Sequence, residues 1–184
     1  TSLFTKAYLE NDTLTEATRY LVNELFGALG LVIIDGDDAL LKQGLIPYMQ
    51  EDIFRNTPFH KVNESIEVLS KVSKDYKIQV NPREINYFYL QDGIRERIVK
   101  DGERFSVLNT NITFTQEALE KEMENAPEHF SPNVIARPLY QEVILPNLCY
   151  IGGGGELAYW LELKDYFDAL DVPFPMLLLR PPVL

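Results

Sequence analysis

The strongest chemical signal in the sequence is a run of four glycines between two apolar stretches. Residues 148–151 read as a strand, and residues 156–170 read as a helix. Glycine has no Cβ, so a ligand can approach this backbone closely, and the first turn of a helix offers free N–H groups that favour an anion. A close-packed turn is the alternative, but four glycines exceed what a turn needs. We therefore predict a ligand-binding loop formed by Gly152, Gly153, Gly154 and Gly155.

Glu156 and Tyr159 follow the glycines three residues apart, so both can face a ligand of this loop. Glu156 could accept a hydrogen bond from an amine or a hydroxyl, or act as a base, which makes it the candidate catalytic residue. Compensation of the helix dipole is an equally good interpretation of its position. The run lacks the Lys-Ser/Thr of a P-loop and the spacing of a dinucleotide fingerprint, so nucleotide binding by the loop does not follow.

Arg137 is the second candidate for binding a ligand. Pro138 favours a helix that begins at this point, and a cation is poorly placed at a helix start unless it meets a carboxylate or a phosphate. Gln141, one turn later, could hydrogen-bond the same ligand. The alternative is an ion pair between Arg137 and Glu142 or Glu156.

The composition excludes several kinds of partner. The chain has 184 residues, 28 acidic and 17 basic, and a formal charge of −11. Such a surface repels nucleic acids and anionic membranes. Two histidines, for which the sequence suggests no partner, and one cysteine make a zinc site improbable, so we expect no metal. Cys149 cannot form an internal disulfide, which favours the cytoplasm.

The elements that position these residues indicate an α/β fold. A capping box at Thr13 and Glu16 predicts a helix that ends near Gly30, and the apolar run 31–34 predicts a strand buried in a parallel sheet. A helix broken near Pro47 should follow over 39–54. We therefore expect a Rossmann-like parallel core.

The middle of the chain has a different pattern. A helix is predicted over 62–72, and β-like runs at 85–90, 94–99 and 104–108 are separated by Asp-Gly pairs that suit hairpin turns. These runs predict a small antiparallel meander inserted into the core. The basic residues of the meander alternate with acidic ones, which favours a solvated, cross-paired face: Arg95, Arg97, Lys100 and Arg104.

The last third returns to the α/β pattern. A polar helix is predicted over 116–125, Ser131-Pro132 resembles a helix start, and 176–179 reads as a further buried strand. We expect three parts: a first core part (1–56), an inserted helix and meander (57–115), and a second core part with the glycine loop (116–184). A core strand so near the terminus suggests that the natural protein continues.

Several motifs, taken together and in order, resemble one family, the cysteine-adding enzymes of bacillithiol biosynthesis. The residues that carry the resemblance are 20–26, 30–35, 92–97, 131–133, 137–141 and 152–160. The resemblance implies an incomplete Rossmann-like core and a ligase that joins L-cysteine to glucosaminyl-malate, with ATP as one possible activator. It also implies that this chain is an inactive internal portion, and that a homo-oligomer could form through a coiled coil outside it.

Two other functions remain open at this stage. The glycine loop could belong to a Rossmann-type methyltransferase, and the acidic surface could belong to a non-catalytic interaction module. For the ligase, we expect Arg137 and the glycine loop to hold a carboxylate, while Gln141, Tyr159 and Glu156 orient the amine.

Overall fold

The computed structural model describes residues 2–181, in two units that span Thr1–Asp38 and Ala39–Leu184. The smaller unit contains α1 (Ser2–Leu9), α2 (Leu14–Phe26) and the 3₁₀ turn η1 (Gly27–Leu29). The predicted capping box is confirmed, because Thr13 Oγ1 accepts the N–H of Glu16 and the Glu16 carboxylate accepts the N–H of Thr13. Gly30 ends this helical stretch at φ +84°, where glycine is favoured.

The strand predicted at 31–34 is wrong. These residues have no regular secondary structure, and Val32 is 65% exposed. A parallel strand forms only when a neighbouring strand accepts and donates its backbone hydrogen bonds. No strand in residues 2–181 pairs with this run, so its apolar composition alone does not make it a strand.

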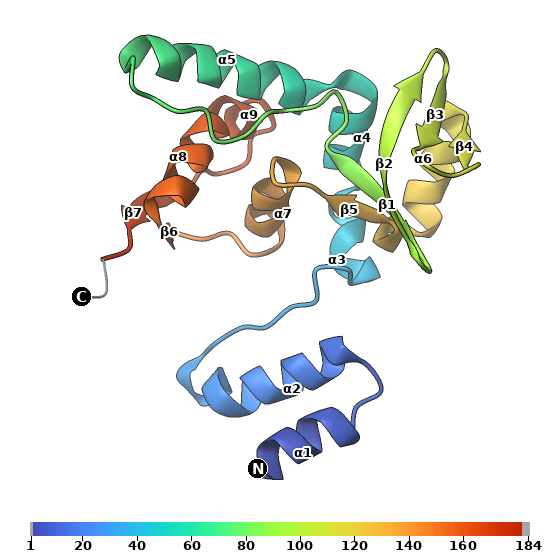
Figure 1. Cartoon of the computed structure of the whole chain (residues 1–184), viewed down its shortest axis with the longest axis vertical. Helices are drawn as coiled ribbons and strands as arrows, with labels where there is room; N and C mark the ends of the chain where they lie inside the picture. Colours follow the sequence, from blue (N-terminus) through green and yellow to red (C-terminus); the bar gives the residue numbers. More distant parts are fainter. Residues whose placement is uncertain (1, 182–184) are drawn as a thin grey trace. The chain divides into compact units, whose positions relative to one another are not determined.

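The larger unit contains most of the helices, and its strands β1 to β4, within residues 87–114, lie at one edge (Figure 1). The predicted break near Pro47 is confirmed, because two helices occupy the region, and the next helix begins earlier than predicted. The helices in chain order are α3 (Ala39–Gln43), α4 (Ile46–Arg55), α5 (Thr57–Val72), α6 (Gln116–Asn125), the 3₁₀ turn η2 (Pro127–His129), α7 (Ala136–Ile144), α8 (Gly154–Glu162) and α9 (Lys164–Ala169). The single helix predicted over 156–170 is divided at Leu163 into α8 and α9.

The predicted meander is confirmed and extended by two strands. Within residues 2–181 it forms an antiparallel sheet in the order β4-β3-β2-β1-β5. Gly93 and Gly102 take positive φ in its two Asp-Gly turns. The strands are β1 (Tyr87–Gln91), β2 (Ile94–Asp101), β3 (Arg104–Val107), β4 (Thr113–Phe114) and β5 (Phe130–Pro132).

The helix start predicted at Ser131-Pro132 is wrong, because both residues lie in β5 and pair with β1. The cap belongs to Asn133, whose Oδ1 accepts the N–H of Ile135 at 2.7 Å. Asparagine is as good a cap as serine, and the sequence places both before α7. The pairing of Ser131 with Phe88 places Ser131 in the sheet, which leaves Asn133 as the residue that caps the helix.

A second, parallel pair consists of β6 (Cys149–Gly152) and β7 (Met176–Leu179). Among the described residues these are the only parallel strands, so the fold is a mixed α/β arrangement and not the larger parallel sheet that we expected. The strand predicted at 176–179 exists, but it is not buried, since Met176 is 70% exposed. No helix in the described part of the chain is long and apolar enough to span a bilayer.

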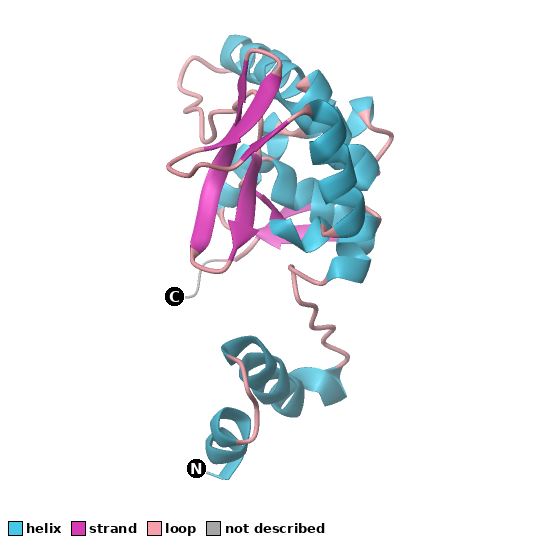
Figure 2. Ribbon diagram, turned by 90° about the vertical axis from the view of Figure 1, so that its right-hand side faces the viewer, coloured by secondary structure: helices cyan, strands magenta, loops and turns pink. Residues whose placement is uncertain are grey.

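Two apolar cores hold the larger unit together, and α7 contributes to both. One core lies under the antiparallel sheet, where strand residues such as Tyr87 and Phe105 meet α4 and α6. The sheet carries helices on one side (Figure 2), which matches the alternation of buried and half-buried residues along the first four positions of β1. The other core surrounds Trp160 and joins α5, α8 and α9. Ala136 and Tyr140 pack in the first core and Leu139 in the second, which fixes the helix that carries Arg137.

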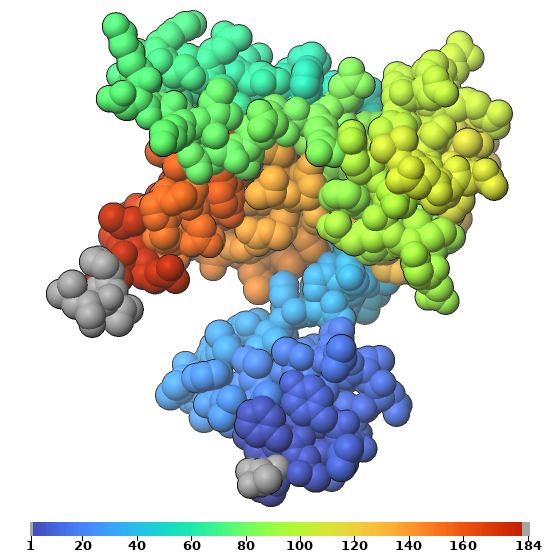
Figure 3. Space-filling model, viewed as in Figure 1, coloured from blue at the N-terminus to red at the C-terminus, as the bar shows by residue number. Residues whose placement is uncertain are grey.

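The connecting segment, residues 73–86, is tied to α8 by one buried carboxylate. Glu162 is fully buried, and its oxygens accept the hydroxyl of Tyr76 and the N–H groups of Gln79 and Val80 at 2.8–3.1 Å. Figure 3 shows this segment, in light green, against the orange surface of α8. Three donors on one carboxylate compensate its burial. The segment is therefore held beside the helix that follows the glycine loop.

Candidate functional site

The glycine run joins β6 to α8, as the sequence predicts. Gly152 ends the strand, Gly153 is the helix N-cap in an extended conformation, and Gly154 begins the helix. A Cβ on Gly152 would lie 2.8 Å from the Tyr150 ring and 3.2 Å from Glu156 Cβ, so this glycine is required by the packing of the protein itself. A Cβ on Gly154 would meet no described heavy atom within 4 Å, so that backbone is open to an incoming group.

Glu156 lies in the first turn of α8 and caps the start of this helix. Its Oε2 accepts the N–H of Gly153 at 2.7 Å, which is one half of a capping box, since the glycine at the N-cap has no side chain that could accept the Glu156 N–H. This contact places the carboxylate at the helix start, as the dipole interpretation expects, while the role of Glu156 as a base stays a prediction. Its other oxygen is 3.5 Å from the hydroxyl of Tyr150, a long contact that leaves it able to accept another donor.

Arg137 reaches from α7 to α8. Its Nη2 donates to the Tyr159 hydroxyl at 3.2 Å, and its Nη1 donates to Gln141 Oε1 at 3.4 Å. These contacts bring together three of the predicted ligand-binding residues. Neither of the alternative ion pairs, to Glu142 or to Glu156, exists among the described residues. The guanidinium thus has neutral partners and is exposed, so an added anion can reach it.

The acidic neighbour of Gln141 is occupied elsewhere. Glu142 is 2% exposed and accepts both the backbone N–H and the side-chain amide of Asn147, at 2.8 and 2.9 Å. Gln141 donates its amide to the same carboxylate at 3.1 Å, so its oxygen is turned towards Arg137. The orientation of Gln141 is therefore set by Glu142.

Two residues of this site were not predicted from the sequence. Tyr150 stacks on Trp160, with ring centroids 4.4 Å apart, and a Cβ on Gly153 would lie 3.7 Å from the Arg180 guanidinium. Burial raises the pKa of Tyr150, and the neighbouring Tyr159 and Glu156 add to this effect, so its hydroxyl stays protonated. Tyr150 could have been predicted as a site residue, because residues two apart on a strand share a face, and Gly152 of the predicted ligand loop lies two residues after Tyr150. Arg180 could not, because it follows β7, which is near only through the strand pairing.

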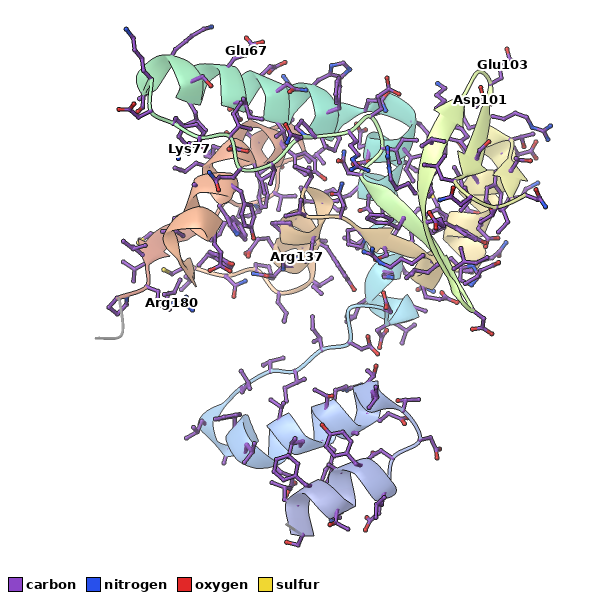
Figure 4. The ribbon with its side chains drawn as sticks, viewed as in Figure 1. Glu67, Lys77, Asp101, Glu103, Arg137 and Arg180 are labelled. Atoms are coloured by element: carbon purple, nitrogen blue, oxygen red, sulfur yellow. The ribbon has the colours of Figure 1, made fainter. Side chains whose placement is uncertain are left out.

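These groups make up the candidate site, and the donors among them are of the kind that favour an anion. Figure 4 labels Arg137 on α7 and Arg180 beyond the end of β7. Between their elements lie the first turn of α8, with free N–H groups, and the hydroxyls of Tyr150 and Tyr159. Such donors can hold a carboxylate and direct a nearby amine or hydroxyl towards Glu156. The described residues contain no group of three or more His, Cys, Asp or Glu side chains that could hold a metal ion.

Two further expectations, one about His129 and one about the basic residues of the antiparallel sheet, need correction. His129 does have partners: its Nδ1 is 2.7 Å from Glu122 Oε1, which also accepts the Tyr89 hydroxyl at 2.7 Å. The described structure has no ion pair between a carboxylate and a basic residue of β2 or β3, although Arg104 lies directly opposite Asp101 in the strand register. Alternating residues of a strand point to opposite faces, so Glu96 cannot pair with the arginines on either side of it.

Comparison with known proteins identifies the family. Residues 1–181 match the family model described as "Bacillithiol biosynthesis BshC, N-terminal Rossmann-like domain". A "Putative cysteine ligase BshC" of Flavobacterium johnsoniae is 57% identical over 99% of this chain and 34% of its own length. Proteins with the same name are 54% identical in Christiangramia forsetii, over 97% of this chain and 33% of their own length, and 35% identical in Lysinibacillus sphaericus, over 91% and 31%.

The chain spans about a third of the length of these relatives. The match covers both units, the antiparallel sheet and the glycine loop, and it confirms the resemblance drawn from the motifs. The chain belongs to the bacillithiol biosynthesis BshC family, in its N-terminal Rossmann-like domain.

Proposed function

We propose that the full-length protein to which this chain contributes joins L-cysteine to glucosaminyl-malate, and that this chain supplies part of the substrate pocket. Family membership and the ligase name of the relatives support the reaction class. The observation that carries the role of the chain is the Arg137 guanidinium, which bridges to Tyr159 and pairs with no carboxylate in residues 2–181. No observation favours the methyltransferase or the interaction module.

The roles of the side chains follow from their contacts. Arg137 and the N–H groups at the start of α8 would hold a substrate carboxylate. Tyr159 and Gln141 would fix the guanidinium, since both accept from it. The amine would attack the activated carboxyl of cysteine, the bond from that carbonyl carbon to the activating group would break, and the activating group would leave. Glu156 would receive the amine proton on the oxygen that Gly153 does not use. Amide formation gains most from holding both reactants in position.

Substitution of Arg137 in the full-length enzyme tests this assignment. Arg137→Ala should raise the apparent KM about 10- to 100-fold, because a charge-assisted hydrogen bond contributes roughly 1.5–3 kcal/mol. Arg137→Lys keeps the charge but loses the planar, paired N–H donors of the guanidinium, so the KM of this variant should lie between those of the wild type and Arg137→Ala. Arg104→Ala, an exposed arginine at the start of β3, is the matched control. An unchanged KM in Arg137→Ala would reject the assignment.

Other parts of the interpretation remain proposals. We propose that β6 and β7 belong to a larger parallel sheet of the whole protein, and that the chain divides into 1–56, 57–115 and 116–184. In that division β5 lies in the last part although it pairs with β1. A cytoplasmic location fits the single cysteine. The resemblance leaves ATP as one possible activator, and it implies that a homo-oligomer could form through a coiled coil outside this chain.

A further inference from the structure

A pocket of about 490 Å³ has Arg137 as one of its lining residues. Three arginines line it, and they come from three segments: Arg83 from the connecting segment, Arg95 from β2 and Arg137 from α7. No Asp or Glu among the described residues lines it. Acidic residues outnumber basic ones 28 to 17 in this chain, so the pocket has the opposite charge to the molecule as a whole.

The three guanidinium groups have no anionic partner among residues 2–181. Arg95 lies over the ring of Phe88, 4.0 Å from its centroid, and Arg137 donates to two neutral oxygens. The Arg83 side chain has neither a hydrogen bond nor an ion pair within the described chain, although its backbone is fixed. Like charges gathered at one pocket repel each other, so an anion bound there would stabilise the arrangement.

The walls of this pocket are held in place by Asn86, which is fully buried. Its side chain accepts the N–H of Arg83 and the amide of Asn133, and it donates to the Arg83 carbonyl, at 2.8–3.2 Å. Its carbonyl accepts the N–H of Asn133, whose own carbonyl accepts the N–H of Arg137. One amide therefore links two of the three arginines, and rigid walls reduce the entropic cost of binding.

We propose that this arginine pocket binds a small organic or inorganic dianion whose charge is carried by carboxylate or phosphate oxygens. Guanidinium matches both groups with paired N–H donors, and a dianion would compensate two of the three positive charges, whereas a monoanion would compensate only one. The volume lies within the range of about 300–1,000 Å³ found for small-molecule sites. Glucosaminyl-malate is one ligand of this class, but the inference depends on the charge and shape of the pocket and not on the proposed reaction.

Isothermal titration of the 184-residue chain tests the proposal with succinate, inorganic phosphate and acetate, each at constant ionic strength. Saturable binding of succinate or phosphate is expected, at least about tenfold tighter than acetate, and the stronger of the two identifies the preferred oxygen chemistry. Arg83→Gln and Arg95→Gln should each weaken that binding about tenfold or more. Arg137 is left unchanged, so a failure of the proposed reaction does not affect this result.

Arg104→Gln removes the same charge from the same sheet outside the pocket and is the matched control. Arg95→Lys keeps the charge and should restore part of the affinity, which separates binding from misfolding. Melting temperature checks that each variant is folded. The proposal is overturned if the folded chain binds no dianion more tightly than acetate, or if Arg104→Gln weakens binding as much as Arg83→Gln does.

Discussion

Asp52 is a buried carboxylate whose charge is only partly compensated. It is fully buried in α4, its Oδ1 accepts the N–H of Asn86 at 2.7 Å, and its Oδ2 has no hydrogen-bond partner among the described residues. Burial raises the pKa of Asp52 from 3.8 to about 7, although the hydrogen bonds from Asn86 oppose the shift. The folded protein therefore binds a proton at Asp52 more tightly than the unfolded chain does.

The stability of the chain should fall with rising pH because of this residue. The folded state keeps the proton between pH 4 and pH 7 while the unfolded state has lost it, so the free energy of unfolding decreases across that window and levels off above it. The total effect is at most about 4 kcal/mol. Asp52→Asn removes this titrating group. The free energy of unfolding of the wild type, relative to that of the variant, should therefore fall by roughly 2–3 kcal/mol from pH 5 to pH 8.

Urea unfolding at pH 5, 6, 7 and 8 measures that difference. Glu124→Gln, which removes an exposed carboxylate from α6, is the control and should give a nearly constant difference. A constant difference for Asp52→Asn as well would show that Asp52 has an ordinary pKa in the folded protein.

At the scale of elements, the glycine loop combines two kinds of glycine. Gly152→Ala should destabilise the chain by about 1–3 kcal/mol, since the added methyl meets the Tyr150 ring, which is itself packed on Trp160. Gly154→Ala should be neutral or stabilising by up to about 1 kcal/mol, because its Cβ enters open space and the unfolded chain loses freedom. Thermal unfolding of both variants is the measurement, and equal effects would contradict this description of the loop.

Elements that depend on local signals were predicted correctly from the sequence. The capping box at Thr13, the Asp-Gly turns and the helix over 116–125 each need only their own residues. The errors concern residues whose state depends on a distant partner. Residues 31–34 lack a neighbouring strand in the described structure, whereas Ser131 finds one in β1.

Only the local contacts of the candidate site could be predicted from the sequence, because its other contacts depend on distant partners. The contacts of Arg137 with Gln141 and of Glu156 with Gly153 lie within one helical turn, so their spacing is visible in the sequence. The sequence does not show that Arg137 lines a pocket together with Arg83 and Arg95. That arrangement depends on how β1, β5 and the connecting segment pack around α7. Pairing with nearby acids was a reasonable expectation for Arg95, and its position over Phe88 could not be predicted without the sheet register.

At the scale of the whole molecule, the two units differ in how much they bury. In the smaller unit, Ala7 and Ala17 are the buried hydrophobic residues among those described, while the larger unit has two extended cores. A unit of fewer than about 40 residues rarely folds without further support. Each alanine contributes little, since stabilisation scales with the apolar area buried.

Hydrogen exchange should therefore distinguish the units in the isolated chain. Amides of α1 and α2 should exchange at least about 100-fold faster than those of α5 and α7, because opening of a unit with a small core costs little free energy. Exchange measured by mass spectrometry at peptide resolution tests this. Equal protection in α2 and α5 would show that the smaller unit gains stability from contacts other than its own core.

The Arg137 guanidinium belongs to both regions of the larger unit, since it lines the arginine pocket and donates to Tyr159 at the helix that follows the glycines. An anion in the pocket would compete with Tyr159 for the same N–H groups. Occupancy of either region must then alter affinity at the other by an equal factor, because thermodynamic coupling is reciprocal. A titration of one ligand in the presence of the other would read that factor directly.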